Sequence, residues 1–166
     1  MEVKTVAQTR TTMTEVVLPN DTNTLGNVLG GKVMHLMDIA AAIAAYRHCR
    51  QPVVTVSVDS LQFLHPVKMG HILMLEACVT RAFSTSMEVE VEVFSEDPLS
   101  GAKKKTSTAF LTFVAIDKQG SPSRVPAIVA ETEEEKRRYQ DAQERREQRL
   151  GEAREKTRKP REEDTK

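Results

Sequence analysis

The feature that most constrains the fold is the apolar segment from Gly31 to Cys49. Its apolar residues, which run from Val33 to Ala45, fall on almost every side of a helix drawn through them. Such a helix is enclosed by other structure rather than laid on a surface. It would be about 27 Å long. Pro52 follows shortly after and ends it.

Segments with the alternation of β-strands lie on both sides of the predicted helix. We predict strands over 53–63, 72–83, 86–94 and 103–116, and a weaker one over 13–18. In the segment 86–94 valines alternate with Glu88, Glu90 and Glu92, which is typical of a strand exposed on one face. The short turns between the four later strands predict an antiparallel meander. We therefore expect an α+β fold in which a five-stranded antiparallel sheet wraps around one long central helix.

The last part of the chain has a different composition. Residues 131–166 hold 12 acidic and 12 basic residues and almost nothing apolar. Opposite charges three and four positions apart predict a solvated helix that ends at Gly151, with Pro160 in frayed chain beyond it. A coiled-coil arm would need an apolar heptad seam, which is absent. We divide the chain into a folded domain over 1–130 and a highly charged helical or disordered tail over 131–166.

Composition excludes several classes of protein. Lysine plus arginine and aspartate plus glutamate both number 24, so the net charge is zero, which argues against a nucleic-acid or anionic-membrane binder. No apolar run approaches the roughly 18 residues of a membrane span, and the N-terminus lacks a signal-peptide core. Two cysteines suit a reducing compartment. We expect a cytoplasmic protein without nucleic-acid or membrane partners.

Gly30 and Gly31 stand directly before the long helix. The spacing from Gly26 to Gly31-Lys32 resembles a phosphate-binding loop, but Val33 occupies the position that needs serine or threonine for magnesium, and an antiparallel meander is the wrong context. Glycines there instead let a ligand approach the first helical amides, which have no acceptor within the helix. These amides can polarise a carbonyl oxygen, and one such donor is typically worth roughly 100- to 1000-fold in rate.

Asp38 interrupts the apolar helix, where a carboxylate is costly to bury without a partner. The residues alone leave two interpretations open, a functional carboxylate or one satisfied by backbone donors or an arginine. Asn27 likewise fits a helix-entry loop or a catalytic amide.

His35, one turn before Asp38, could form a metal site or a hydratase dyad with it. No third ligand has suitable spacing, so we expect no metal ion here. We expect instead a core histidine that is hydrogen-bonded to Asp38 or to the backbone. Cys49 and Cys78 are interpreted as structural.

An ordered set of motifs over residues 10–130 resembles the hotdog-fold acyl-CoA thioesterases. The motifs are Gly26-Asn27-x-x-Gly30-Gly31, Met34, Met37-Asp38, Arg47-His48, Thr55-x-x-x-Asp59, Phe63-x-x-Pro66 and Thr85-Ser86-Met87-Glu88-Val89. The resemblance implies a hotdog fold, which agrees with the architecture above. It also implies a homodimer, often assembled as a hexamer of three dimers.

The resemblance implies roles for particular residues. The active site would lie between two protomers, with Asn27 from one and Asp38 from the other. Thr85 and Ser86 would lie near the coenzyme A arm. Where family members usually carry Gly-Arg before Thr-Ser, this chain has Phe83-Ser84. Arg81 is a candidate substitute for the missing cation.

Lys103-Lys104-Lys105 offers another set of phosphate-binding cations, although lysines at a strand end more often protect a solvated edge. The implied function is hydrolysis of fatty acyl-CoA, with Gly30 and Gly31 at the carbonyl and Asp38 as general base or nucleophile. Coenzyme A would be part of substrate and product, and no separate cofactor is expected. The alternatives are a non-catalytic acyl-CoA sensor and a hotdog hydratase or dehydratase.

Overall fold

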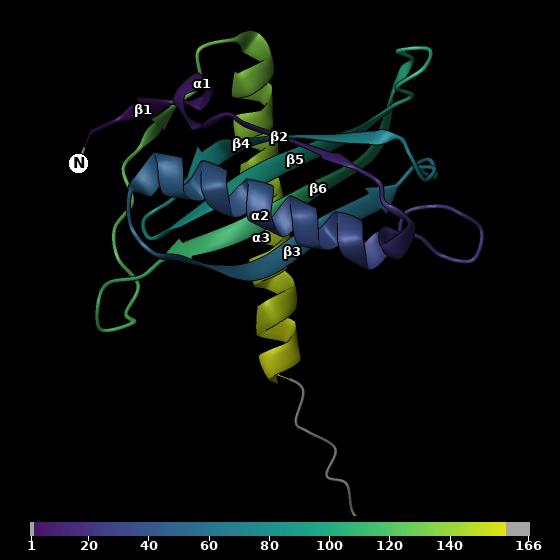
Figure 1. Ribbon diagram of the computed structural model, residues 1–166. Helices are drawn as coiled ribbons and strands as arrows, with labels where there is room; N and C mark the ends of the chain where they lie inside the picture. Colours follow the sequence, from purple (N-terminus) through teal and green to yellow (C-terminus); the bar gives the residue numbers. More distant parts are fainter. Residues whose placement is uncertain (1, 159–166) are drawn as a thin grey trace, which may run out of the picture.

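The structure is a computed structural model that describes residues 2–158 (Figure 1). Its elements in chain order are β1 (Lys4–Thr5), α1 (Val6–Thr9), β2 (Thr11–Val16), the short 3-10 helix η1 (Pro19–Asp21), α2 (Gly30–Cys49), β3 (Val53–Phe63), β4 (Ile72–Ala82), β5 (Ser86–Glu96), β6 (Lys103–Ala115), β7 (Ile128–Val129) and α3 (Glu133–Arg158). The long helix and all five predicted strands are present, close to their expected bounds.

Five strands form one antiparallel sheet in the order β2-β4-β5-β6-β3. Strands β4, β5 and β6 are a meander, as predicted. The prediction is wrong for β3, which pairs with β6 at the far edge instead of with β4. The connection 64–71 carries the chain across the sheet end, past the entrance of α2, where Asn27 forms a bridge with Lys68.

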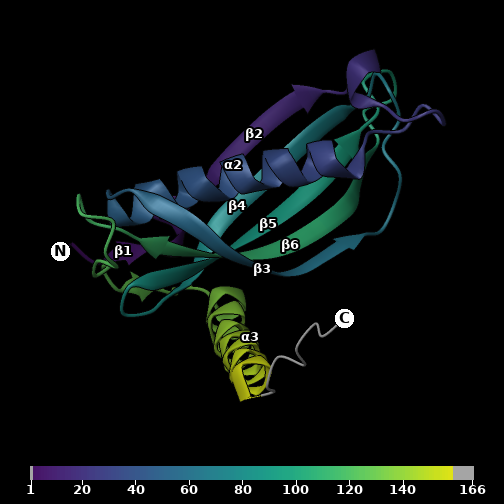
Figure 2. The ribbon, with the colours of Figure 1, turned by 90° about the horizontal axis from the view of Figure 1, so that it is seen from below.

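Helix α2 lies in the hollow of the curved sheet (Figure 2). Its alanines 40, 41, 44 and 45 are fully buried, since small side chains let the helix approach the strands closely. The sheet covers one side of the helix, whereas Met34 and Tyr46 on the other side are exposed. The prediction that a five-stranded antiparallel sheet curves around the helix is therefore confirmed, but within one chain the helix is enclosed on the sheet side only.

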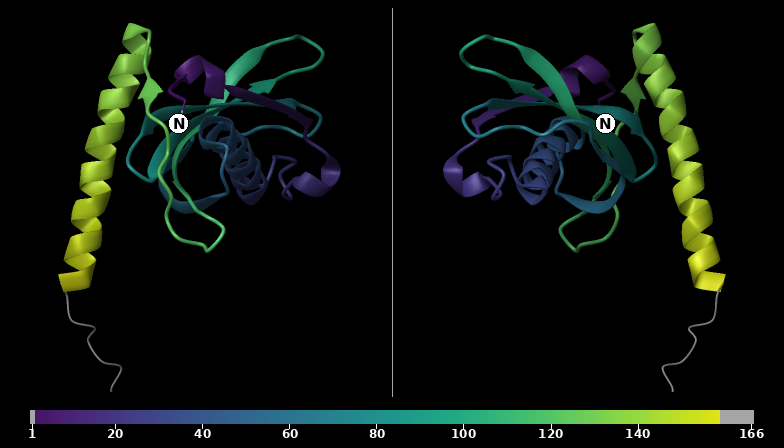
Figure 3. Two further views of the ribbon diagram at one scale, coloured as in Figure 1. Left: turned by 90° about the vertical axis from the view of Figure 1, so that its left-hand side faces the viewer. Right: turned by 90° about the vertical axis from the view of Figure 1, so that its right-hand side faces the viewer.

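Helix α3 packs on the opposite face of the sheet from α2 (Figure 3). It runs through Gly151 to Arg158 instead of ending at the glycine, and Ala142 in its middle is fully buried. The predicted helix is thus present, but the prediction that it is solvated is wrong for the side that faces the sheet. Pro160 lies outside the described residues.

Ion pairs hold α3 against the sheet. Glu88 is 1% exposed and accepts two hydrogen bonds from Arg145, of 2.9 and 2.8 Å, while Glu90 accepts one of 2.7 Å from Arg138. The expectation of a half-exposed strand at 86–94 is therefore wrong as well. The polar face of β5 is covered by a helix of matching charge, and the arginines neutralise carboxylates that would otherwise be costly to bury.

This arrangement predicts that Arg145→Ala lowers the free energy of unfolding by about 3 kcal/mol, because it leaves the Glu88 carboxylate buried without its counter-ion. Lys136→Ala, which removes an exposed pair with Glu133 on the same helix, is the control and should cost less than about 0.5 kcal/mol. Denaturant unfolding at one protein concentration measures both. Adding Glu88→Gln to Arg145→Ala should restore part of the loss. Equal stability of the Arg145 and Lys136 variants would contradict the role given to the buried pair.

Within residues 2–158, no helix is both long enough and apolar enough to cross a membrane.

Candidate active site

The entrance of α2 presents two free backbone donors. Leu29 precedes the helix without a side-chain cap, and its own amide donates to the Asp21 carbonyl at 2.8 Å, which holds the loop in place. The amides of Gly30 and Gly31 donate to no acceptor among the described residues, and both glycines are exposed. A β-carbon added at Gly31 would meet nothing within 4 Å. The predicted carbonyl-polarising site is therefore geometrically open.

A cavity of about 290 Å³ lies beside this entrance. Its lining includes Asn23, Asn27, Gly30, Phe63 and Ser107. The side-chain oxygen of Asn23 accepts hydrogen bonds from the amides of Leu25 at 2.9 Å and Asn27 at 3.2 Å. This leaves the exposed Asn23 NH2 group available as a donor.

Asp38 lies in a second cavity, of about 220 Å³, that is otherwise mostly apolar. The side chains around it are Met34, His35, Met37, Val58, Leu61, Ala109 and Leu111. The half-buried Asp38 accepts a hydrogen bond of 2.7 Å from the Thr55 hydroxyl, which orients the carboxylate. The cavity places an oriented carboxylate next to space suited to a hydrocarbon chain.

The two cavities lie at different points along α2. Asp38 follows Gly30 by eight residues, which is about 12 Å along a helix axis. One small reacting group cannot touch the Gly30 and Gly31 amides and the Asp38 carboxylate of the same chain at once. Asn27 and Gly30 line one cavity, and Asp38 lines the other.

The remaining predicted binding residues lie at both ends of the sheet. Arg81, Thr85 and Ser86 are at the end away from the α2 entrance, whereas Lys103 and Lys105 are at the same end as that entrance. Thr85 lies in the turn before β5 and Ser86 is the first residue of that strand, and the Ala115 amide donates to the Thr85 carbonyl at 3.0 Å. Arg81, near the end of β4, lies under α3 and donates to the Tyr139 carbonyl at 2.9 Å. Lys103 and Lys105 pair with Glu76 and Glu92, which favours their interpretation as a solvated strand edge.

The other titratable candidates make no hydrogen bond to Asp38 in the described structure, although His35 lines its cavity. His35 is exposed and forms no hydrogen bond with Asp38 in the described structure, so the expectation of a core histidine is wrong. Burial raises the pKa of the Cys78 thiol to about 11, which makes it a poor nucleophile. The described residues contain no group of three metal-ligating side chains arranged to hold an ion.

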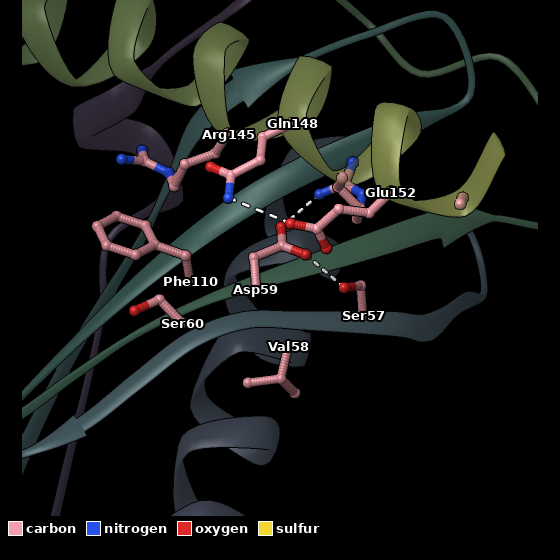
Figure 4. A pocket seen from close by; sticks show the side chains of 10 residues that line it. Ser57, Val58, Asp59, Ser60, Phe110, Arg145, Gln148 and Glu152 are labelled. Carbon is pink, nitrogen blue, oxygen red and sulfur yellow. Dashed lines mark hydrogen bonds and ion pairs between the residues drawn. The ribbon is translucent and has the colours of Figure 1, made fainter. Parts of the chain in front are cut away.

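A larger cavity, of about 690 Å³, lies between α3 and the edge strand β3, on the outer face of the sheet (Figure 4). Figure 4 shows Asp59 pointing toward Ser57, and its carboxylate accepts hydrogen bonds from Ser57 and Arg149. Of the two arginines in this cavity, Arg149 is thus paired with Asp59, and Arg145 is paired with Glu88 of β5. The cavity contains neither Asp38 nor the free amides of α2, so size alone does not make it the reaction site.

Comparison with known proteins finds a match to the thioesterase superfamily model over residues 25–102. The acyl-CoA thioester hydrolase YkhA of Bacillus subtilis, itself uncharacterized, is 42% identical over 81% of this chain and 78% of its own length. The cytosolic acyl coenzyme A thioester hydrolase of Mus musculus is 35% identical over 84% of this chain, which spans only 37% of the mouse protein.

Solved structures are similar over nearly the whole chain. The acyl-CoA hydrolase of Staphylococcus aureus, in complex with butyryl coenzyme A, coenzyme A and coenzyme A disulfide, has a TM-score of 0.88 and 36% identity, covering 94% of this chain and 95% of that one. A hexameric acyl-CoA thioesterase without ligand has a TM-score of 0.89 and 44% identity, covering 92% and 98%.

Three alanine variants of the Staphylococcus aureus enzyme bear on the candidate residues. They replace an asparagine, an aspartate fifteen positions after it, and a threonine seventeen positions after the aspartate. The same spacing in this chain joins Asn23, Asp38 and Thr55. Sequence analysis did not single out Asn23 because the loop 20–31 is rich in asparagine, threonine and glycine. The local signal for Asn23 is its position in an asparagine-initiated turn leading to Gly26.

Proposed function

The chain belongs to the thioesterase superfamily, and from that premise we propose how its residues carry out the hydrolysis of acyl-CoA thioesters. Acyl-CoA hydrolysis is the activity of this protein. The observation that carries the mechanism is the geometry of α2, with two exposed amide donors at its entrance and a hydroxyl-oriented carboxylate in an apolar cavity further along. Coenzyme A enters as part of the substrate and leaves as a product, and water is the other reactant.

In the proposed reaction, the Gly30 and Gly31 amides donate to the thioester oxygen and stabilise the negative charge that develops there. Asp38 acts as general base, taking a proton from water as the water oxygen attacks the carbonyl carbon. The carbon–sulfur bond then breaks, and the coenzyme A thiolate leaves and is protonated. The alternative is direct attack by Asp38, giving an anhydride that water hydrolyses. Asn23 is the amide that positions the substrate, and Asn27 in the same cavity is a second candidate.

We propose that each site takes its amides and its asparagine from one protomer and Asp38 from a partner. The separation of about 12 Å along α2 supports this, because one chain alone cannot bring both groups to one thioester. Strand β3 is an edge of the sheet and exposes Val54, Val56 and Val58. Pairing of this edge with a second copy would extend the sheet and bring the two α2 helices together. A trimer of such dimers gives a hexamer.

We infer a cytoplasmic location from the two buried free cysteines, which suit a reducing compartment, and from the cytosolic relative.

The function is tested by thiol release from acyl-CoA esters of increasing chain length, with Gly31→Val measured beside the natural chain. The valine should lower turnover at least about 100-fold, because it blocks the carbonyl from the free amides. It has room within the protomer, so folding should survive. Gly151→Val is the matched control, since that glycine is also helical and open, and it should leave turnover unchanged. Absence of thiol release from every ester would contradict the function, and a normal rate for Gly31→Val would contradict the role of the amides.

A further inference from the structure

The cavity that contains Asp38 has one wall formed by α2 and another formed by the strands β3 and β6. The strand wall consists of two cross-strand pairs, Val58 with Leu111 and Leu61 with Ala109. Val58 and Leu61 belong to β3, an edge of the sheet, whereas Ala109 and Leu111 belong to β6 inside it. The cavity therefore runs from the edge of the sheet inward, between the sheet and α2.

The inner end of this cavity is closed by buried apolar side chains. Ala109 and Leu111 are 1% and 2% exposed, and Met37 of α2 is 2% exposed. Ala109 and Leu111 pair with Val91 and Val89 of the next strand, β5, and these valines are fully buried. Paired residues share a face of the sheet, so the valines fill the space under α2 beyond the cavity. A chain that enters the cavity must therefore stop at β6.

The outer end of the cavity is open. Met34 of α2 and Val58 of β3 are 45% and 48% exposed, and the half-buried Asp38 is oriented by Thr55, an exposed residue of the edge strand. A thioester carbonyl at Asp38 would direct its acyl chain inward, because the apolar space beside the carboxylate extends to β6. A partner chain at the edge can narrow the opening, but it cannot lengthen a cavity whose inner end lies within the protomer.

The volume of the cavity limits the length of the chain that it can hold. It measures about 220 Å³, and apart from Asp38 and His35 the side chains that line it are apolar. An apolar cavity of about 150 Å³ holds one benzene molecule, a six-carbon ligand. In proportion, the Asp38 cavity has room for about eight or nine carbon atoms. An octanoyl group has this size.

We propose that the acyl chain of the substrate occupies the Asp38 cavity, and that Ala109 at its closed end limits efficient substrates to medium-chain acyl groups, up to about octanoyl. Ala109 has the smallest side chain among the residues that line the cavity. A larger side chain there would take the space of the terminal carbon atoms. The inference rests on the proposed function and names its substrate class.

The test measures kcat/KM for coenzyme A esters from butyryl to dodecanoyl. For the natural chain, kcat/KM should rise about fourfold with each methylene that is buried, and should stop rising near octanoyl. Ala109→Leu adds three carbons at the closed end, so the ratio of kcat/KM for octanoyl-CoA to that for butyryl-CoA should fall about 50-fold. Ala102→Leu makes the same change in the exposed turn before β6, and it is the control that should leave this ratio unchanged.

Leu111→Ala should have the opposite effect, because it enlarges the closed end: kcat/KM should go on rising beyond octanoyl. Hydrolysis of butyryl-CoA shows that the site of each variant is assembled. If Ala109→Leu does not fold, the shift in Leu111→Ala decides alone.

An unchanged ratio in Ala109→Leu would overturn the proposal, even if both rates fell together. It would also be overturned if kcat/KM of the natural chain kept rising from octanoyl to dodecanoyl, or did not depend on chain length; in both cases the hydrolysis itself, and with it the proposed function, would stand. If the natural chain hydrolyses no ester, the proposed function fails. Calorimetric affinities of octanoyl-CoA and butyryl-CoA for the natural chain and for Ala109→Leu then test the limit by the same ratio.

Discussion

Asp38→Asn is expected to lower acyl-CoA turnover by at least about 100-fold, the usual scale for loss of a catalytic base. Asparagine has nearly the same shape as aspartate, and its side-chain oxygen can still accept the hydrogen bond from the Thr55 hydroxyl. It is neutral, so it neither takes a proton from water nor attacks a thioester. Steady-state thiol release measures the loss, while circular dichroism and calorimetric binding of coenzyme A should show an intact fold and site.

His35→Gln is the control for this experiment, because His35 lines the same cavity without bonding to Asp38. It should retain most of the activity. A loss as large as that of Asp38→Asn would instead support the histidine–carboxylate pair of a hydratase, and near-normal hydrolysis by Asp38→Asn would remove Asp38 from the mechanism. Single turnover in water labelled with heavy oxygen separates the two routes, since label enters the Asp38 carboxylate only if Asp38 is the nucleophile.

The helix α2 and the strands around it were predictable because their signals are local. The apolar run from Val33 to Ala45 and the alternation of Val89 and Val91 with Glu88 and Glu90 each depend on neighbouring residues alone. The strand order was harder to predict, because the residues of the segment 53–63 do not show which other strand it pairs with. The pairing with β6 depends on the path of the connection 64–71 across the sheet end.

The position of α3 could not be predicted for a different reason. Alternating glutamates are read as a solvent-facing strand, and a helix rich in both charges is read as solvated. The ion pair of Glu88 with Arg145 joins residues 57 positions apart, so no local pattern records it. Charge complementarity between two polar surfaces is visible only when both are placed in space.

Some residues of the candidate site could be predicted from the sequence one by one. The glycines and Asp38 stand out by residue type within their local pattern, since glycines precede a helix and a carboxylate interrupts an apolar run. The choice between Asn23 and Asn27 does not stand out in this way, because both lie in one polar loop and line one cavity. Measuring Asn23→Ala beside Asn27→Ala separates them.

Mixed assemblies of two inactive variants should recover activity if the site is shared between protomers. In a two-fold dimer of Asn23→Ala with Asp38→Asn, one site receives the intact asparagine and the intact aspartate, and the other receives neither. Random co-assembly of equal amounts makes half of the dimers mixed, so about a quarter of all sites should be active. Co-expression with two different tags allows mixed dimers to be purified, in which half of the sites should work.

The baseline is given by Asp38→Asn dimers in which each of the two chains carries a different tag, because these dimers contain no intact aspartate. The same experiment with Asn27→Ala in place of Asn23→Ala tests the second candidate, and the asparagine that belongs to the site is the one whose loss is complemented. Recovery above both single variants is possible only when the two groups act from different chains, since every chain in the mixture lacks one of them. Purified mixed dimers without recovery would therefore show that the asparagine and Asp38 do not meet across the interface.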